Sequence, residues 1–225
     1  KRVCCLAGVV RTGAGRRAPA AGERTGGARG TADSQRSTFD LLVCGAIQPS
    51  KHQLDAIKAL YLLKREGYGN IRLHIAGAVA NGSEAYLKAI ETFINDNGMH
   101  NEVIMHGYVK DMPQLFAETD VELVCSESEG FGRVIVEAMR SGVVVIAPAC
   151  GAAPEIIDDG EDGLLYEPMN IEDLKAKIIM TLDMNSRNRL SRNAITNTRD
   201  RYLPQNCAKQ VYDTMMEAYG LKGNL

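Results

Sequence analysis

From residue 39 onward, short apolar runs alternate with segments whose hydrophobic residues recur at helical spacing, and this alternation constrains the fold more than any other feature of the chain. Each apolar run has the length of a strand and lacks regular polar alternation, as in "FDLLVCGAI". Strands of this kind are buried on both faces of a parallel sheet. The pattern predicts strands at 39–47, 71–77, 102–109, 121–126, 143–148 and 162–168.

Helical patterns fill the intervals between these strands. Ser83 and Gly98 mark the start and end of one helix, because serine caps helix N-termini and glycine favours the exit. The alternation therefore predicts the α/β class: a single doubly wound, Rossmann-like domain over residues 39–225, with a six-stranded, mostly parallel sheet. The helices are expected at 54–66, 83–97, 112–119, 133–141, 170–184, 187–201 and 205–219.

Residues 1–38 form a low-complexity segment rich in Arg, Gly and Ala. Such a composition buries too little apolar surface to offset its chain entropy, so we expect a flexible leader. The start of the segment is similar to a secretory signal, but Arg11 interrupts the apolar core after about eight residues, at the short end of the expected range. A nucleic-acid-binding arm is the other alternative, although the segment has no aromatic side chain to stack on bases.

The composition of the whole chain argues against several classes of function. The formal net charge of −2 does not favour a nucleic-acid or membrane-surface binder. No apolar run approaches the ~18 residues that span a bilayer. The 6 cysteines form no C-x-x-C pair and the 4 histidines are scattered, so we expect reduced thiols, no metal site and a cytoplasmic location.

In a doubly wound sheet, ligands bind beyond the carboxyl ends of the strands, next to helix N-termini. One such loop reads "SEGFGRVIVEAM", where Gly130 and Gly132 let the backbone approach a ligand. The helix that follows offers free N–H groups and a positive dipole end to a phosphate. Glu129 and Glu137, on either side, are acceptors for sugar hydroxyls, so the loop indicates a nucleotide-sugar site. A plain capped helix with solvated glutamates remains the alternative.

Two further loops at the same edge carry candidate ligand contacts. In "QPSKHQ", Lys51 follows the first strand, where its ammonium can neutralise phosphate oxygens. An exposed surface lysine is the alternative. In "HGYVKDM", the backbone groups of Tyr108 and Val109 are placed to meet the edge of a base, a contact that leaves no signature in the side chains.

These loops, in this order, resemble the C-terminal, donor-binding half of group-one retaining glycosyltransferases of the GT-B fold, over about residues 39–219. The diagnostic features are the two glutamates with seven residues between them, Pro154-Glu155 after the fifth strand, the sequence "DGEDGLL" and the lysine after the first strand. The predicted sheet would then be equivalent to the C-terminal half of a GT-B enzyme.

The resemblance implies a role for each candidate residue. The reaction would transfer a hexosyl group from a UDP- or GDP-sugar with retained configuration and without a metal or cofactor, and the chain contains no Asp-x-Asp. Glu129 would be the catalytic residue and bind hydroxyls of the donor sugar, and Glu137 would bind the ribose. The other donor-binding residues would be Lys51, Tyr108, Val109, Gly130, Phe131, Gly132, Arg133 and Val134.

The chain departs from the family at one phosphate contact. The family has Gly-Arg at the end of the first strand, where the arginine joins the lysine at the phosphates, whereas this chain has Gly45-Ala46. Losing a charge-assisted contact of this kind costs on the order of 1.5–3 kcal/mol. Arg133 is a candidate to replace part of that contact.

The resemblance also implies an N-terminal domain with the acceptor site, which residues 1–38 are too short to form. The last predicted helix carries an apolar stripe that packs either on this domain's own core or on that second domain. Through the second domain we expect a glycan, lipid-linked or small-molecule acceptor and peripheral association with the cytoplasmic face of a membrane. The stripe consists of Val211, Tyr212, Met215, Met216 and Tyr219.

Two other functions are compatible with parts of the pattern. A non-catalytic nucleotide-sugar-binding or regulatory module would need the same donor site and no acceptor domain. A Rossmann dehydrogenase is disfavoured, because the first strand leads into "GAIQPSKHQ" and not into a G-x-G-x-x-G turn.

Overall fold

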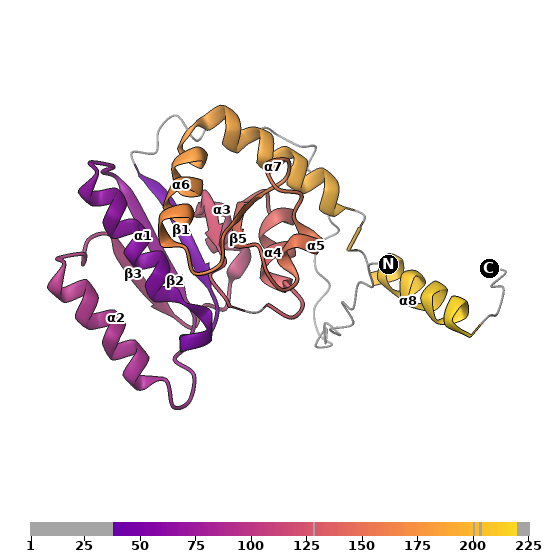
Figure 1. The fold of residues 1–225 in the computed structure, drawn as a ribbon, viewed down its shortest axis with the longest axis horizontal. Coiled ribbons are helices and arrows are strands. Elements are labelled where there is room, and N and C mark those ends of the chain that lie inside the picture. The colour runs from indigo at the N-terminus through magenta and orange to yellow at the C-terminus, as the bar shows by residue number, and fades with distance from the viewer. Residues whose placement is uncertain (1–37, 128, 200, 203, 220–225) are drawn as a thin grey trace.

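The computed structural model describes residues 38–127, 129–199, 201–202 and 204–219 and shows an open sheet with helices on both faces (Figure 1). The strands are β1 Phe39–Cys44, β2 Ile71–Ala76, β3 Val103–Gly107, β4 Val121–Leu123, β5 Val144–Pro148 and β6 Leu164–Tyr166. They pair in the order β3-β2-β1-β4-β5-β6, and every pair is parallel. The predicted α/β Rossmann-like sheet is therefore confirmed.

Helices connect the strands and continue after β6. Ser83 occupies the predicted N-cap position of the second long helix, although its side chain makes no cap hydrogen bond. Asp111 caps the next helix, because its carboxylate accepts a hydrogen bond from the Gln114 N–H at 3.2 Å. The helices are η2 Pro49–Lys51, α1 Gln53–Arg65, α2 Glu84–Asp96, α3 Met112–Glu118, α4 Arg133–Arg140, α5 Ala153–Ile156, α6 Ile171–Leu182, α7 Met184–Arg199 and α8 Pro204–Ala218.

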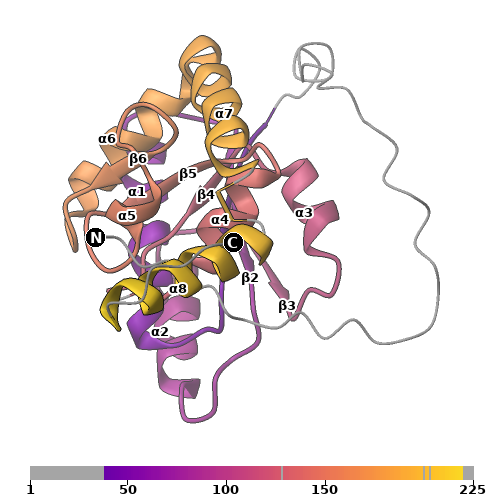
Figure 2. The ribbon, with the colours of Figure 1, turned by 90° about the vertical axis from the view of Figure 1, so that its right-hand side faces the viewer.

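The sheet separates two apolar cores, because successive side chains of a strand point to opposite faces. Leu41 and Val43 of β1 pack on the side of α1, α2 and α6, whereas Leu42 packs on the side of α3 and α4. In β5, Ile146 packs in the core with α1, α2 and α6, and Val145 packs in the core with α3 and α4. Figure 2 shows α1 and α6 on one side of the sheet and α3 on the other. This burial of both faces explains why β5 appears in the sequence as a continuous apolar run, whereas β2 and β3 carry polar residues on their less buried face.

Several strands end earlier than predicted, at the edge where the candidate loops lie. β1 ends at Cys44 and not at residue 47, because the chain turns at Gly45, which has a φ of 146°. A Cβ at Gly77, just after β2, would lie 1.9 Å from the Gly45 carbonyl oxygen, so only glycine fits there. Two short helices, η2 and α5, lie in stretches predicted to be loops. The early ends of β1 and β2 leave room for a site at this edge.

The C-terminal helix α8 projects away from the sheet and its covering helices (Figure 1). In the stripe predicted for it, Tyr212, Met215 and Tyr219 are exposed, and Val211 and Met216 are half-buried. The predicted leader lies outside the described residues except for Thr38. Among the helices that the structure describes, none is both long enough and apolar enough to cross a membrane.

Candidate functional site

A cavity of about 480 Å3 lies at the carboxyl ends of β1 and β2. Its walls come from the loops after β1, β2, β3 and β4 and from the first turns of α4, which is the edge where a doubly wound sheet binds its ligands. The lining residues are Cys44, Gly45, Ala46, Lys51, Ala76, Gly77, Ala78, Tyr108, Val109, Met112, Glu129, Arg133, Val134 and Glu137.

The cavity brings together most of the residues that the sequence singles out, although they come from distant parts of the chain. Lys51 lies in η2, Tyr108 and Val109 follow β3, and Arg133, Val134 and Glu137 belong to α4. Glu129 reaches the cavity from the loop between β4 and α4. Three parallel strands therefore deliver these side chains to one place.

The Gly130-Phe131-Gly132 turn does not line this cavity. Phe131 is 58% exposed. Gly132 is the N-cap of α4 with a φ of 60°, and a Cβ there would lie 2.4 Å from the Ile156 side chain of α5. The structure thus gives Gly132 a packing role, in which it lets α4 begin directly against α5.

Lys51 and Glu129 form an ion pair within the cavity. The Lys51 Nζ lies 2.8 Å from the Glu129 Oε2, and the two side chains are only 26% and 18% exposed. Partial burial reduces the screening that weakens ion pairs on the open surface. The cation predicted for phosphate and the carboxylate predicted for the sugar are therefore partners in this structure.

The loop after β5 holds the backbone of Glu129. The Ala152 N–H donates to the Glu129 carbonyl oxygen at 2.9 Å. Gly151 has a φ of 57°, and a Cβ there would lie 2.8 Å from that same oxygen. The Cys150 thiol donates to the Glu127 carbonyl oxygen at 3.3 Å. The sequence "PACGAAPE" thus supports Glu129, a role that its composition does not reveal.

The loop that carries Lys51 is held in a similar way. Gln53 is fully buried, and its amide donates to the Ala46 carbonyl oxygen at 2.9 Å. The Glu127 N–H donates to the Ser50 carbonyl oxygen at 3.3 Å and joins this loop to the one that carries Glu129. The separation between the Lys51 and Glu129 backbones is therefore set by hydrogen bonds on both sides.

Sequence reasoning missed Glu122, a fully buried residue of β4 next to the cavity. The backbone N–H of Cys44, which lines the cavity, donates to the Glu122 Oε1 at 3.0 Å, and the Cys44 thiol donates to the Oε2 at 3.4 Å. Burial raises the pKa of Glu122 to about 8, and the charge of Glu137 adds to this rise. A charged residue inside the apolar run "VELVCS" was the signal that could have revealed it.

A second polar cluster lies on the same face of the sheet but lines no part of the cavity. Asp40 accepts a hydrogen bond from the Arg72 Nε at 2.9 Å, and one Asp40 oxygen lies 3.1 Å from the His74 Nε2. The His74 Nδ1 lies 2.8 Å from the His106 Nε2, and the two rings stack. In the part of the chain that the structure describes, no group of three or more His, Cys, Asp or Glu side chains is arranged to hold a metal.

Comparison with known sequences identifies a family for most of the chain. The family model of glycosyl transferases group 1 matches residues 32–197. A D-inositol 3-phosphate glycosyltransferase of Arthrobacter sp. (strain FB24) is 34% identical over 133 residues, which are 57% of this chain and 31% of that protein. An uncharacterized 41.2 kDa protein in the cps region of Klebsiella pneumoniae is 41% identical over 67% of this chain and 42% of its own length. The chain thus spans less than half of these relatives.

Solved structures of glycosyltransferases have the same fold as this chain. Anabaena HepE in complex with UDP-glucose is 27% identical, with a TM-score of 0.74 over 80% of this chain and 49% of that chain. The C-terminal domain of LpcC, a glycosyl transferase group 1 family protein of Francisella tularensis, is 27% identical, with a TM-score of 0.70 over 77% of this chain and 91% of that chain. The chain therefore belongs to the group 1 glycosyl transferases and has the fold of the C-terminal domain of a GT-B glycosyltransferase.

Proposed function

We propose that the cavity binds a nucleoside-diphosphate sugar and that the chain is the donor-binding part of a hexosyltransferase. The observation that carries this proposal is the convergence of two cations and two carboxylates, Lys51, Arg133, Glu129 and Glu137, on one cavity at the carboxyl edge of the sheet. The volume of about 480 Å3 lies within the range of about 300–1,000 Å3 typical of ligand pockets. Cations suit a diphosphate, and carboxylates suit the hydroxyls of the two sugars at its ends.

Each part of the donor has a matching group in the cavity. Lys51 and Arg133 bind the diphosphate together with the N-terminal N–H groups of α4. Glu137, exposed one turn into α4, accepts hydrogen bonds from the ribose. Tyr108 is 79% exposed at the cavity and offers its ring and backbone to the base. Glu129 accepts hydrogen bonds from the donor sugar and acts as the catalytic residue.

During transfer, the bond between the anomeric carbon and the diphosphate oxygen breaks and negative charge develops on the leaving diphosphate. Lys51 and Arg133 stabilise that charge in place of a metal ion. The acceptor hydroxyl oxygen bonds to the anomeric carbon, and its proton passes to the leaving diphosphate. We further propose that the transfer retains the anomeric configuration and that the acceptor binds to a second domain. The exposed stripe of α8 is a surface on which that domain can dock, in a cytoplasmic enzyme or one at the cytoplasmic face of a membrane. UDP is our first choice of nucleotide because HepE was solved with UDP-glucose, and GDP is the second.

A non-catalytic nucleotide-sugar-binding or regulatory module is the second candidate. Ala46 favours it, because the family's arginine at this position would supply a charge that the cavity lacks. Both candidates require donor binding, and only the first requires turnover with an acceptor domain.

Thermal unfolding in the presence of UDP, GDP and their hexose conjugates tests the proposal. We expect at least one of these ligands to raise the Tm of the chain, and Glu137→Ala to reduce the shift by removing the ribose contact. Glu91→Ala, a change at an exposed glutamate of α2 outside the cavity, is the control and should leave the shift intact. If no compound in the panel raises the Tm and none binds in a calorimetric titration, the proposal is wrong.

A further inference from the structure

We infer that Glu129 sets the preference of this site for a nucleoside-diphosphate sugar over the bare nucleoside diphosphate, because Glu129 competes with phosphate for Lys51. The inference rests on the proposed function and concerns which ligand the cavity prefers. It starts from the ion pair between the Lys51 Nζ and the Glu129 Oε2 at 2.8 Å.

The ion pair is held in place by the backbones on both sides. Ala152 fixes the Glu129 backbone, the buried Gln53 fixes the loop that carries Lys51, and the hydrogen bond from Glu127 to Ser50 joins the two loops. The backbones of the two charged residues are therefore held at a fixed separation, and only the side chains must be ordered to form the pair. A phosphate that binds Lys51 therefore competes with the Glu129 carboxylate for the same ammonium group.

The two ligand classes differ in what they offer the Glu129 carboxylate when their phosphate takes Lys51. A nucleoside diphosphate takes Lys51 through its terminal phosphate and leaves the Glu129 carboxylate without its cation, close to a negatively charged group. A nucleoside-diphosphate sugar places hydroxyl donors where the carboxylate can accept them. The carboxylate therefore exchanges one partner for another only when the sugar is present. After transfer, the product has lost that sugar, and Glu129 can recover Lys51 and promote product release.

The second cation of the cavity does not share this competition. Arg133 has no ion-pair partner among the described residues, so its contact with phosphate breaks no existing pair. Ala46 carries no charge. The competition is therefore confined to Lys51, and a change at Glu129 should affect the bare diphosphate more than the conjugate.

Calorimetric titration of the full chain with UDP and UDP-glucose, and with GDP and GDP-mannose as the second pair, tests this inference. Glu129→Gln removes the charge and keeps the shape of the side chain. We expect it to raise the affinity for the bare diphosphate about three- to tenfold and to lower or leave unchanged the affinity for the conjugate. The ratio of the two dissociation constants should therefore shift toward the bare diphosphate.

Glu127→Gln is the matched control. Glu127 lies on the same loop, carries the same charge and is 73% exposed, and it lies 3.8 Å from the Nε2 of the His52 ring. This variant should change the ratio by less than about twofold, as expected for an exposed charge. A single cooperative unfolding transition without ligand shows that both variants fold, and we expect the Tm of Glu129→Gln to be slightly lower because this variant loses the ion pair.

The outcomes distinguish a failure of the competition at Lys51 from a failure of the donor site itself. If the wild-type chain binds a conjugate but Glu129→Gln does not raise the affinity for the bare diphosphate, the inference is overturned and the donor site stands. The same holds if Glu127→Gln raises that affinity as much as Glu129→Gln does. If the wild-type chain binds neither member of either pair, the proposed function fails, and the inference fails with it.

Discussion

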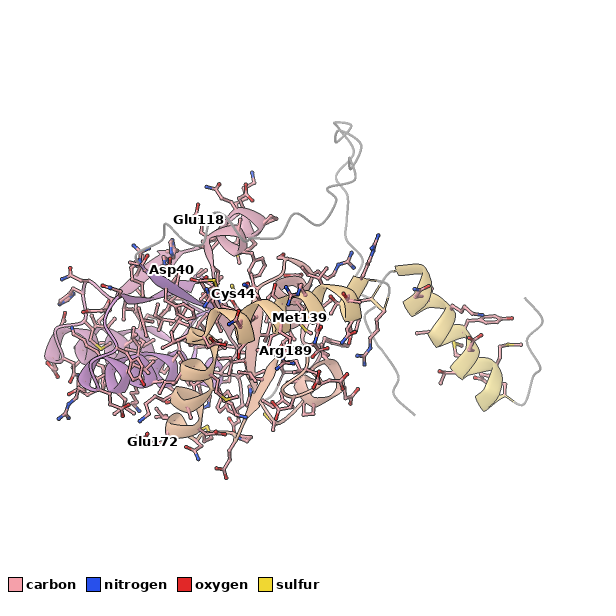
Figure 3. The ribbon with its side chains drawn as sticks, turned by 90° about the horizontal axis from the view of Figure 1, so that it is seen from above. Asp40, Cys44, Glu118, Met139, Glu172 and Arg189 are labelled. Carbon is pink, nitrogen blue, oxygen red and sulfur yellow. The ribbon has the colours of Figure 1, made fainter. Side chains whose placement is uncertain are left out.

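Two carboxyl groups on the same face of the sheet, Asp40 of β1 and Glu122 of β4, lie in opposite electrostatic surroundings. Both are buried, at 5% and 0% exposure. Burial raises the pKa of each, but hydrogen bonds from His74 and Arg72 and their charges outweigh burial at Asp40 and hold its pKa below the ordinary value. At Glu122, the backbone and thiol of Cys44 are the donors, and the pKa rises to about 8. Figure 3 labels Asp40 and Cys44 toward opposite ends of β1.

The opposite pKa shifts of Asp40 and Glu122 reflect which of the two carboxyl groups has a cation beside it. Beside Asp40, Arg72 and His74 project from the neighbouring strand and neutralise the carboxylate directly. Beside the cavity, Lys51 pairs with Glu129. No cation of the described part of the chain is among the groups that act on Glu122, and burial raises its pKa to about 8, which favours the protonated form at neutral pH. A buried carboxyl group remains charged only where a cation reaches it, and otherwise it keeps its proton.

Asp40→Asn should give the largest effect on stability. It leaves the partly buried Arg72 without its counter-ion, and we expect the free energy of unfolding at pH 7 to fall by about 2–3 kcal/mol. Chemical denaturation measures the change, with Asp96→Asn at an exposed position of α2 as the control. Because the pKa of Asp40 is lowered in the folded state, this contribution exists above pH 3.8 and disappears as pH falls through the folded pKa. A deficit that is equally large at pH 7 and in strong acid would contradict the account.

Glu122→Gln should have a smaller effect with the opposite dependence on pH. The pKa of Glu122 rises from 4.5 to about 8 on folding, so the unfolded chain ionises first and wild-type stability should fall between these values as pH rises. Glutamine cannot ionise, so the variant should lose this slope and exceed the wild type at pH 8 by on the order of 1 kcal/mol or more. Denaturation at pH 5, 6.5 and 8 measures both curves. Parallel curves would mean that Glu122 is ionised in the folded protein.

Ala46→Arg should add a cation at the cavity, where Lys51 is already paired with Glu129. Ala46 is exposed and lines the cavity, so the longer side chain has room. If the donor phosphates lie there, affinity for the conjugate should increase about tenfold. Ala46→Gln, of similar length and without charge, is the control. Equal affinities for the two variants would exclude a missing phosphate contact.

The architecture was predictable from the sequence, because strand-length runs rich in apolar residues alternate with segments whose apolar residues recur at helical spacing. Strand ends were harder to predict: apolar residues continue through Ile47, while the turn at Gly45 depends on the close approach of Gly77 from the next loop. Such an approach between distant segments leaves no local pattern.

The sequence identified the residues of the candidate site, but it did not reveal which of them form an ion pair. Lys51, Glu129 and Glu137 stand out because charged residues flank apolar strands and a glycine turn. The ion pair between Lys51 and Glu129 depends on the contact between two loops about 80 residues apart, and no local rule provides it. Glu122 stands out as the one charged residue in its apolar run, but its role depends on its contacts with Cys44 of β1, which is distant in the sequence.

The most direct test of the donor site is a calorimetric titration of the wild-type chain and of Ala78→Trp with UDP-glucose and GDP-mannose. Ala78 is exposed and lines the cavity, so tryptophan should fill the cavity without disturbing a core. We expect saturable binding of at least one conjugate to the wild type, and at least a tenfold loss in Ala78→Trp at an unchanged Tm. Binding that is absent from the wild type, or equally strong in Ala78→Trp, would contradict it.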